Sequence, residues 1–342
     1  MHAALRAIEF HLPDATLSTA QLAAEFPEWT VAKIDAKTGI HCRHLASPQE
    51  CASDLAVTAA KKLFDSGACD PQDVDYILLC TQSPDYFLPT TACLLQERLG
   101  IPTTAGALDF NLGCSGFIYG LGLAEALVCS GQAKRILLLT AETYSKFLNS
   151  RDRSVRTIFG DAAAATLLSA SDSTVPLLGP FVYGTDGSGG PNLIVPAGGM
   201  RCPRSEETAL EKEDDQGNVR AANELYMNGP EVFNFTLERV PETVRRLLEK
   251  SALALEQVDL FVFHQANSYM LDHLRKRLGI PQEKFVIAMG DCGNTVSSTI
   301  PIALKHVALS RRLTPGMSVM AVGFGVGYSW GAAMVRCDQP LV

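Results

Sequence analysis

Short runs of apolar residues alternate along the chain with segments whose apolar positions recur every three or four residues. The short runs predict strands in the first half, at Leu5–Glu9, Asp75–Cys80, Ala107–Phe110, Arg135–Thr140 and Ala163–Leu168. The amphipathic segments predict helices between them, at Ala52–Ser66, Thr90–Leu99 and Gly116–Ser130. Uninterrupted apolar strands are typical of a sheet that is covered on both faces. The alternation therefore predicts an α/β fold.

The second half of the chain repeats features of the first half in the same order. The strand pattern of Val74–Gln82 recurs at Val258–Gln265, and the motif Leu99–Pro102 recurs at Leu278–Pro281. Each repeated motif is followed by a strand and then by a polar turn, which is Asn111–Cys114 in one half and Asp291–Asn294 in the other. We therefore expect an internal duplication, with halves at residues 1–172 and 173–342 that pack about a pseudo-twofold axis. The irregular, glycine-rich stretch from Tyr183 to Asn228 is expected to be a long binding loop or lid early in the second half.

Composition narrows the class of protein. Of the 342 residues, 47% are hydrophobic and 19% are charged, and the net charge is −8, so a basic nucleic-acid surface is not expected. The ten cysteines include no C-x-x-C pair, which favours reduced thiols in the cytoplasm and predicts no metal site. No signal peptide is expected at the start, and no apolar run is long enough to predict a membrane span.

Cys114 is the first candidate for chemistry. It follows the predicted strand Ala107–Phe110 and a tight turn, and it opens the predicted helix. A helix N-terminus carries unpaired N–H groups and a partial positive charge. We therefore expect an exposed sulfur with a lowered pKa, as a nucleophilic cysteine requires.

His264 and Asn294 are the second and third candidates. His264 directly follows the apolar strand Val258–Phe263, and ligands bind at the carboxyl edge of strands in open α/β sheets. Asn294 occupies the position in the second half that Cys114 occupies in the first. Taken singly, His264 could be a satisfied core histidine, and Asn294 could be a turn residue or helix cap. The predicted duplication brings a nucleophile, a base and an amide donor to one junction.

A glycine-rich segment, Gly323–Gly331, follows the apolar strand Val319–Val322. No helical pattern comes after it, so it predicts a strand–turn–strand and not a dinucleotide-binding loop. Its backbone N–H groups are expected to be free to bind an oxygen of a ligand.

With these motifs, the sequence resembles the thiolase-like condensing enzymes, and most closely the β-ketoacyl-acyl-carrier-protein synthase III family. The resemblance covers essentially the whole chain. The matching motifs are Gly113–Phe117, His264–Asn267, Gly293–Thr295, Phe159–Ala163, Lys37–Ile40 and Trp330-Gly331. It implies a thiolase-like five-layer αβαβα fold with internal duplication.

The resemblance also implies a decarboxylating Claisen condensation in two steps. Cys114 would take an acyl group from an acyl-CoA, and the N–H groups of Cys114 and Val326 would hold the oxyanion. His264 and Asn294 would then stabilise the enolate formed when malonyl-acyl carrier protein loses CO2. No metal or other cofactor is implied.

Substrate-binding positions are carried over with some departures. The resemblance assigns CoA or substrate contacts to Lys37, Arg153, Phe233 and Asn267, and it implies a homodimer in which Leu88 reaches the partner's acyl pocket. An ungapped match to Thr38-Gly39-Ile40 puts Lys33 where the family has a tryptophan that stacks on the adenine. Further departures are Pro230 in the pantetheine region, Tyr269 at a basic carrier-docking position and Val326 in the glycine run.

Other functions remain open on the sequence alone. The order Cys114, His264, Asn294 also occurs in papain-like proteases, although the duplication and the parallel-sheet pattern argue against that class. An acyltransferase of the same fold could pass the Cys114-bound acyl group to a hydroxyl or amine. A catalytically silent subunit is the non-enzymatic alternative.

Overall fold

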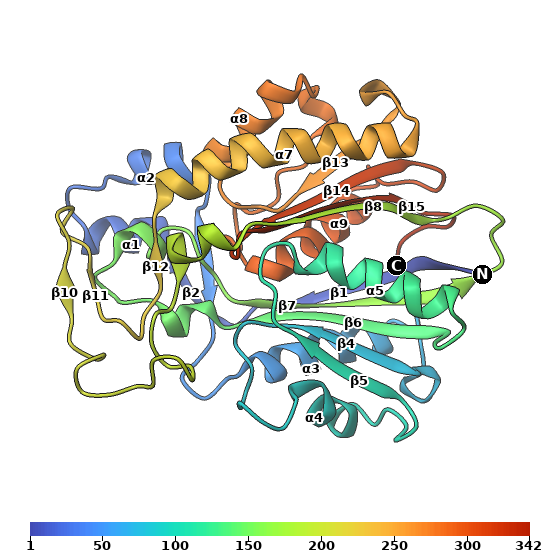
Figure 1. The fold of residues 1–342 in the computed structure, drawn as a ribbon, viewed down its shortest axis with the longest axis horizontal. Helices are drawn as coiled ribbons and strands as arrows, with labels where there is room; N and C mark the ends of the chain where they lie inside the picture. Colours follow the sequence, from blue (N-terminus) through green and yellow to red (C-terminus); the bar gives the residue numbers. More distant parts are fainter.

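The computed structural model describes all 342 residues. Its two main β-sheets are separated by one layer of helices, and a further layer of helices covers the outer face of each sheet (Figure 1). The five layers follow from the apolar strands, because a sheet that is apolar on both faces must be covered on both. The expected five-layer αβαβα arrangement is confirmed.

The first sheet belongs to the first half of the chain. Its strands are β1 (His2–His11), β4 (Tyr76–Cys80), β5 (Gly106–Phe110), β6 (Arg135–Glu142) and β7 (Ala162–Ser171). Their order is β1-β7-β6-β4-β5; β4 pairs in parallel with β5 and β6, and β7 runs antiparallel to both β6 and β1. The predicted strands are thus all present, and β5 is left as an open edge.

The second sheet repeats this topology. Its strands are β8 (Leu178–Thr185), β13 (Leu260–Phe263), β14 (Ser318–Gly325) and β15 (Ser329–Arg336), in the order β13-β14-β15-β8. As in the first sheet, β13 and β14 are parallel, and β15 is antiparallel to β14 and β8. Phe285 forms a parallel bridge to Phe261 of β13, at the place that β5 takes beside β4. The repeated order confirms the duplication, and the boundary drawn at residue 172 lies in the connection between β7 and β8.

The central layer consists of α5 (Gly116–Cys129) and α9 (Thr299–Leu309). Both are apolar helices, and they bury residues from both sheets in one core cluster that includes Phe117, Leu138, Ile300 and Val319. Because the apolar side chains of each helix pack between the two sheets, burial holds the helix and its first residue in a defined position.

The outer layers and the connections complete the fold. Against the first sheet lie α3 (Ala52–Asp65) and α4 (Thr91–Arg98), and against the second lie α7 (Gly229–Ser251) and α8 (Ser268–Leu278) (Figure 1). The remaining helices are α1 (Thr19–Glu25), α2 (Val31–Thr38) and α6 (Arg153–Arg156), and β2 (Ala15–Ser18) pairs with β3 (Cys42–Leu45). None of the helices is both long and apolar enough to cross a membrane.

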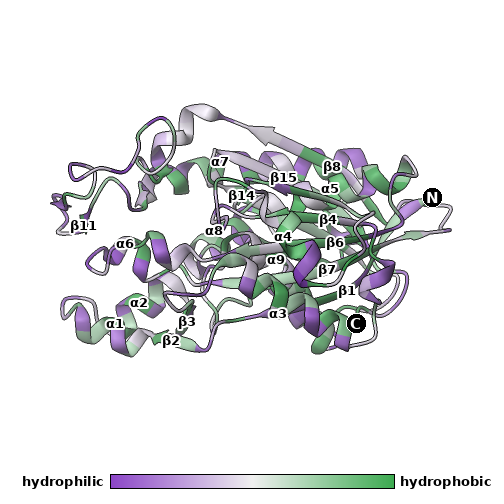
Figure 2. Ribbon diagram, turned by 90° about the horizontal axis from the view of Figure 1, so that it is seen from below, coloured by the Kyte–Doolittle hydropathy of each residue, from purple (hydrophilic) through white to green (hydrophobic).

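The expected excursion between Tyr183 and Asn228 is present beside the ends of the sheets. It carries two short ribbons, β9 (Leu193–Ile194) with β12 (Tyr226–Met227) and β10 (Lys212–Glu213) with β11 (Val219–Arg220). Figure 2 shows this region as largely hydrophilic, at the end of the molecule that lies away from the apolar strands. The two ribbons provide hydrogen bonds within the loop. The loop lies at the end of the molecule where the strands lead into their turns.

Candidate active site

Cys114 lies in the turn between β5 and α5, where the duplication places it. The helix begins at Gly116, with Ser115 as its N-cap residue, so Cys114 precedes the helix instead of opening it. Its sulfur is not exposed as expected: the residue is only 5% accessible. The turn packs closely against Gly325 of β14: a Cβ added at this glycine would lie 2.9 Å from the Cys114 sulfur. Only glycine leaves room for the sulfur at that point of the glycine-rich segment.

The expected lowering of the Cys114 pKa is wrong. Burial raises the pKa of the thiol to about 12, and the negative charge of Glu142 adds to this. The backbone N–H groups of Val326 and Cys114 act in the opposite direction, because both donate toward the sulfur and favour the thiolate. They do not outweigh desolvation of the charged form. The resting nucleophile is therefore a thiol beside two preorganised N–H donors.

His264 comes directly after β13, as expected, and is 2% accessible. Burial lowers the pKa of its imidazole to about 3, so the ring is neutral at physiological pH. Its Nδ1 lies 2.8 Å from Thr299 Oγ1, which in turn lies 3.0 Å from the carbonyl oxygen of Val296. The hydroxyl can accept from Nδ1–H while donating to Val296, or donate to Nδ1 and leave the proton on Nε2. Thr299 thus accommodates either neutral tautomer of His264.

Asn294 is held by its backbone and by one side-chain oxygen. Its N–H donates to the carbonyl of Ile158, and its own carbonyl accepts from Gly160 N–H, so the segment Ile158-Phe159-Gly160 holds the turn in place. The Asn294 Oδ1 accepts from Val296 N–H at 2.9 Å. Because this oxygen is engaged, the amide NH2 remains the free donor.

One pocket brings the three residues together. It has a volume of about 160 Å³ and is lined by Cys114, His264, Asn294 and mostly apolar neighbours that include Phe159, Leu193 and Phe324. Phe233, Asn267 and Tyr269 also line it. Asn267 has a structural task as well, because its Oδ1 caps α8 by accepting from Met270 N–H. The predicted nucleophile, imidazole and amide donor therefore share one small, largely apolar cavity.

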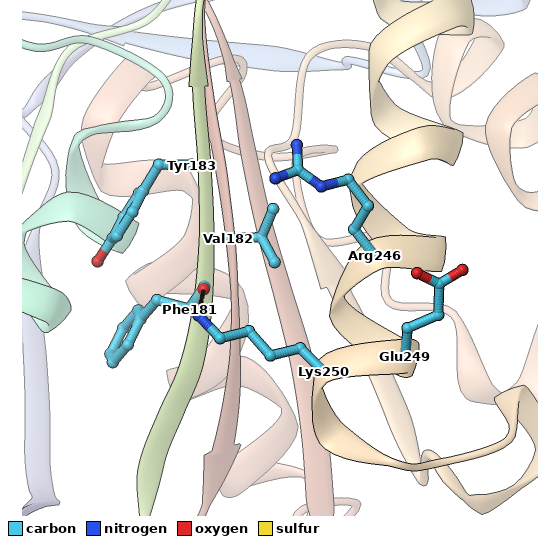
Figure 3. Close-up of a pocket in the computed structure, with 6 residues that line it drawn as sticks. All are labelled: Phe181, Val182, Tyr183, Arg246, Glu249 and Lys250. Carbon is cyan, nitrogen blue, oxygen red and sulfur yellow. Dashed lines mark hydrogen bonds between the residues drawn. The ribbon is translucent and has the colours of Figure 1, made fainter.

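A second hollow, of about 560 Å³, is more open and unrelated to this pocket. It lies between β8 and α7 and is lined by Phe181, Val182, Tyr183, Arg246, Glu249 and Lys250 (Figure 3). Figure 3 shows Arg246 reaching from the helix toward the strand that carries Val182, with Glu249 alongside the helix, and Lys250 donates to the carbonyl of Phe181. None of the predicted site residues reaches it.

Comparisons with known proteins identify the family of this chain. Residues 108–187 match the family model described as 3-oxoacyl-[acyl-carrier-protein (ACP)] synthase III, and residues 248–337 match the one for its C terminal. The β-ketoacyl-[acyl-carrier-protein] synthase III of Clostridium perfringens (strain ATCC 13124) is 38% identical over 312 residues, which are 91% of this chain and 92% of that protein. The chain belongs to the 3-oxoacyl-[acyl-carrier-protein] synthase III family.

Solved structures of the synthase III family have the same fold. One 3-oxoacyl-(acyl-carrier-protein) synthase III is 54% identical with a TM-score of 0.97, over 98% of this chain and 100% of its own. The synthase from Burkholderia xenovorans LB400 is 34% identical with a TM-score of 0.90, over 100% of this chain and 96% of its own. Membership in this family rules out the papain-like alternative, and the names of the relatives do not favour a hydroxyl or amine acceptor.

Trp29 is a candidate binding residue that the sequence analysis did not single out. The structure puts Lys37 Nζ 4.7 Å and the Arg153 guanidinium 5.9 Å from the centre of its ring. Lys33, at the position that an ungapped match assigns to the family tryptophan, lies over the same ring at 5.3 Å. Trp29 precedes Lys33 by about one helical turn. Lys37 and Arg153 thus meet at this indole and do not line the pocket.

Glu142, at the end of β6, also went unnoticed in the sequence. Burial raises the pKa of its carboxyl group to about 8. The group accepts hydrogen bonds from the Gln82 N–H, the Ser83 hydroxyl and the Ser297 hydroxyl, at 3.0–3.1 Å for the shortest contact of each. Gln82 and Ser83 come from the half that carries Cys114, and Ser297 comes from the loop after Asn294. Glu142 therefore links the segment after β4 in the first half to the loop after Asn294 in the second half.

Leu88 does not line the pocket in a single chain. It is 82% exposed, and the neighbouring Tyr86 and Phe87 are also exposed, at 62% and 78%. The pocket of one chain is therefore lined by the predicted catalytic residues without any contribution from this exposed apolar segment.

The raised pKa of Cys114 predicts how its reactivity depends on pH. Alkylation by iodoacetamide should accelerate about tenfold per pH unit from about pH 6 to about pH 10, because the thiolate fraction rises by that factor below the pKa. Intact mass spectrometry against Cys114→Ala identifies the site of modification. Glu142→Gln should alkylate faster than the wild type only above about pH 8, where Glu142 becomes charged. A rate that levels off below about pH 8 would contradict the assignment.

Proposed function

We propose that this protein joins the acyl group of an acyl-CoA to malonyl-acyl carrier protein with loss of CO2, giving a 3-oxoacyl-carrier protein. The observation that carries the proposal is the single pocket lined by Cys114, His264 and Asn294. Membership in the 3-oxoacyl-[acyl-carrier-protein] synthase III family supports the same reaction.

In the first half-reaction, the Cys114 sulfur attacks the thioester carbonyl of acyl-CoA. The carbonyl oxygen becomes an oxyanion that accepts from the N–H groups of Cys114 and Val326, the two donors already directed at the sulfur. The C–S bond to CoA then breaks, and CoA leaves as a thiol with the proton that Cys114 lost. The products are acyl-Cys114 and free CoA.

In the second half-reaction, malonyl-carrier protein occupies the vacated part of the pocket. Its thioester carbonyl accepts from the Asn294 amide and from His264 Nε2–H, the tautomer in which Thr299 donates to Nδ1. These donors stabilise the enolate that forms when the carboxylate departs as CO2. The enolate carbon attacks the carbonyl of acyl-Cys114, the C–C bond forms as the C–S bond to Cys114 breaks, and the released Cys114 thiolate takes a proton from water.

The nucleotide end of acyl-CoA is assigned to Trp29, Lys37 and Arg153. An indole face offers a stacking surface to adenine, and the two cations suit phosphate groups. Phe233 and Asn267 line the pocket along the path that the pantetheine arm would follow to Cys114. This division places the charged end of CoA outside the apolar cavity and its thioester inside.

A homodimer is the proposed assembly. Strand β5 is an unpaired sheet edge whose Leu108 is 41% exposed, and the neighbouring segment Tyr86–Leu88 exposes three apolar side chains. Exposed sheet edges and apolar patches of this kind mark interfaces. Pairing of two copies along β5 would cover them and carry Leu88 to the partner's acyl pocket.

The central test separates the two half-reactions. The protein is incubated with a panel of acyl-CoAs, its intact mass is read, and malonyl-carrier protein is then added. Cys114→Ala should gain no acyl mass. His264→Ala and Asn294→Ala should still be acylated but should lose decarboxylation by about 10²–10³-fold each, since each removes one preorganised donor. Acylation of Cys114→Ala, or full condensation by either donor variant, would refute the assigned roles.

Trp29→Ala tests nucleotide recognition. We expect KM for acyl-CoA to rise about fivefold to tenfold with kcat little changed, because a stacking contact with the donor is lost. The matched control is an acyl-pantetheine donor, which has no adenine and should show no change between wild type and variant. An equal KM increase for both donors would show that Trp29 does not act through the adenine, which contradicts the proposed stacking contact.

Leu88→Trp tests whether the protein is a dimer and whether Leu88 enters the acyl pocket of the partner. Light scattering should give the mass of two chains, and the larger side chain should shift donor preference toward shorter acyl groups by filling the partner's pocket. Leu309→Trp, at an exposed position at the end of α9, is the control and should leave preference unchanged. A monomer, or the same preference in both variants, would contradict the proposed interface.

A further inference from the structure

A cluster of potential metal ligands lies at the opposite end of α5 from the active site. His2 at the start of β1 faces Glu125 and Cys129 in the last turn of α5, and the ligand atoms of all three lie within 4.8 Å of one another. Figure 1 shows the chain start beside this end of the helix. Because α5 has 14 residues, the cluster is about 21 Å along the helix from the Cys114 end.

The distances suit a tetrahedral ion. His2 Nδ1 lies 2.9 Å from Glu125 Oε1, Cys129 Sγ lies 3.2 Å from the same oxygen, and Sγ lies 3.9 Å from Nδ1. A zinc ion with bonds of about 2.0–2.3 Å would hold such atoms about 3.3–3.6 Å apart. Shifts of about 0.5 Å or less would therefore complete the geometry.

The glutamate is already oriented for this role. Its second oxygen, Oε2, accepts from the backbone N–H of Ala3 at 2.6 Å, which turns Oε1 toward His2 and Cys129. An outer hydrogen bond of this kind fixes a carboxylate ligand before the metal arrives. Glu125 has no lysine or arginine partner, and its one ion-pair contact is with His2. The exposed sulfur of Cys129 leaves an entry path for an ion.

We propose that His2, Glu125 and Cys129 bind one Zn²⁺ ion, with water as the fourth ligand. A thiolate, an imidazole and a carboxylate form a mixed set that suits this borderline-soft cation, and the two negative ligands balance its charge. The ion takes the place of the thiol proton, which is released on binding. The site clips β1 to α5 and takes no part in the reaction at Cys114.

The test uses the untagged, chelator-stripped protein with zinc and cobalt salts. One zinc should bind per chain in competition with a chromophoric chelator, and Co²⁺ should give a thiolate-to-metal charge-transfer band and tetrahedral d–d bands. Cys129→Ser should abolish the band, and His2→Ala and Glu125→Gln should weaken binding about tenfold or more. Cys93→Ser, at an exposed cysteine on α4, and Cys114→Ala are the controls and should bind like the wild type.

Thermal unfolding gives a second readout. Zinc should raise Tm of the wild type and of both control variants but not of Cys129→Ser, because only the folded chain assembles the three ligands. Retention of condensing activity after zinc removal would agree with a structural role. Zinc binding that survives in Cys129→Ser, or that is lost in Cys114→Ala, would overturn the proposal.

Discussion

The burial of α5 and α9 between two apolar sheets is the constraint on which the site depends. Each helix follows a polar turn, and packing of the helix against both sheets holds that turn in position. Cys114 precedes one of these helices, and Asn294 precedes the other. The duplicated topology therefore brings side chains from distant parts of the sequence to one junction, where β14 adds the glycine that leaves room for the sulfur.

The same burial sets the electrostatics of the pocket. Cys114, His264 and Glu142 all have pKa values displaced toward their neutral forms, with desolvation as the largest cause in each. A neutral resting site suits a reaction in which charge develops only on the substrate oxygen and enolate. Fixed N–H and amide donors can then stabilise that charge without reorganisation.

The two ends of α5 have different chemical surroundings. The Cys114 end is enclosed and lined by apolar groups, whereas the Cys129 end is open and carries a carboxylate and an imidazole beside its thiol. A cysteine buried under glycine is suited to form a covalent intermediate with a bound substrate. A cysteine exposed beside hard and borderline ligands is suited to bind a cation.

The sequence by itself determined the strand and helix pattern, the duplication and the order of Cys114, His264 and Asn294, because local apolar periodicity and short motifs carry that information. Tertiary structure decided the rest. Desolvation depends on what covers a side chain, so the raised pKa of Cys114 could not be inferred from a position near a helix start. Trp29 and Arg153 are far apart in the sequence and meet only in the folded chain, and Glu142 meets Ser297 only where the halves pack. The same reason hid the cluster at His2, whose partners lie far along the chain and become neighbours only when β1 enters the sheet beside α5.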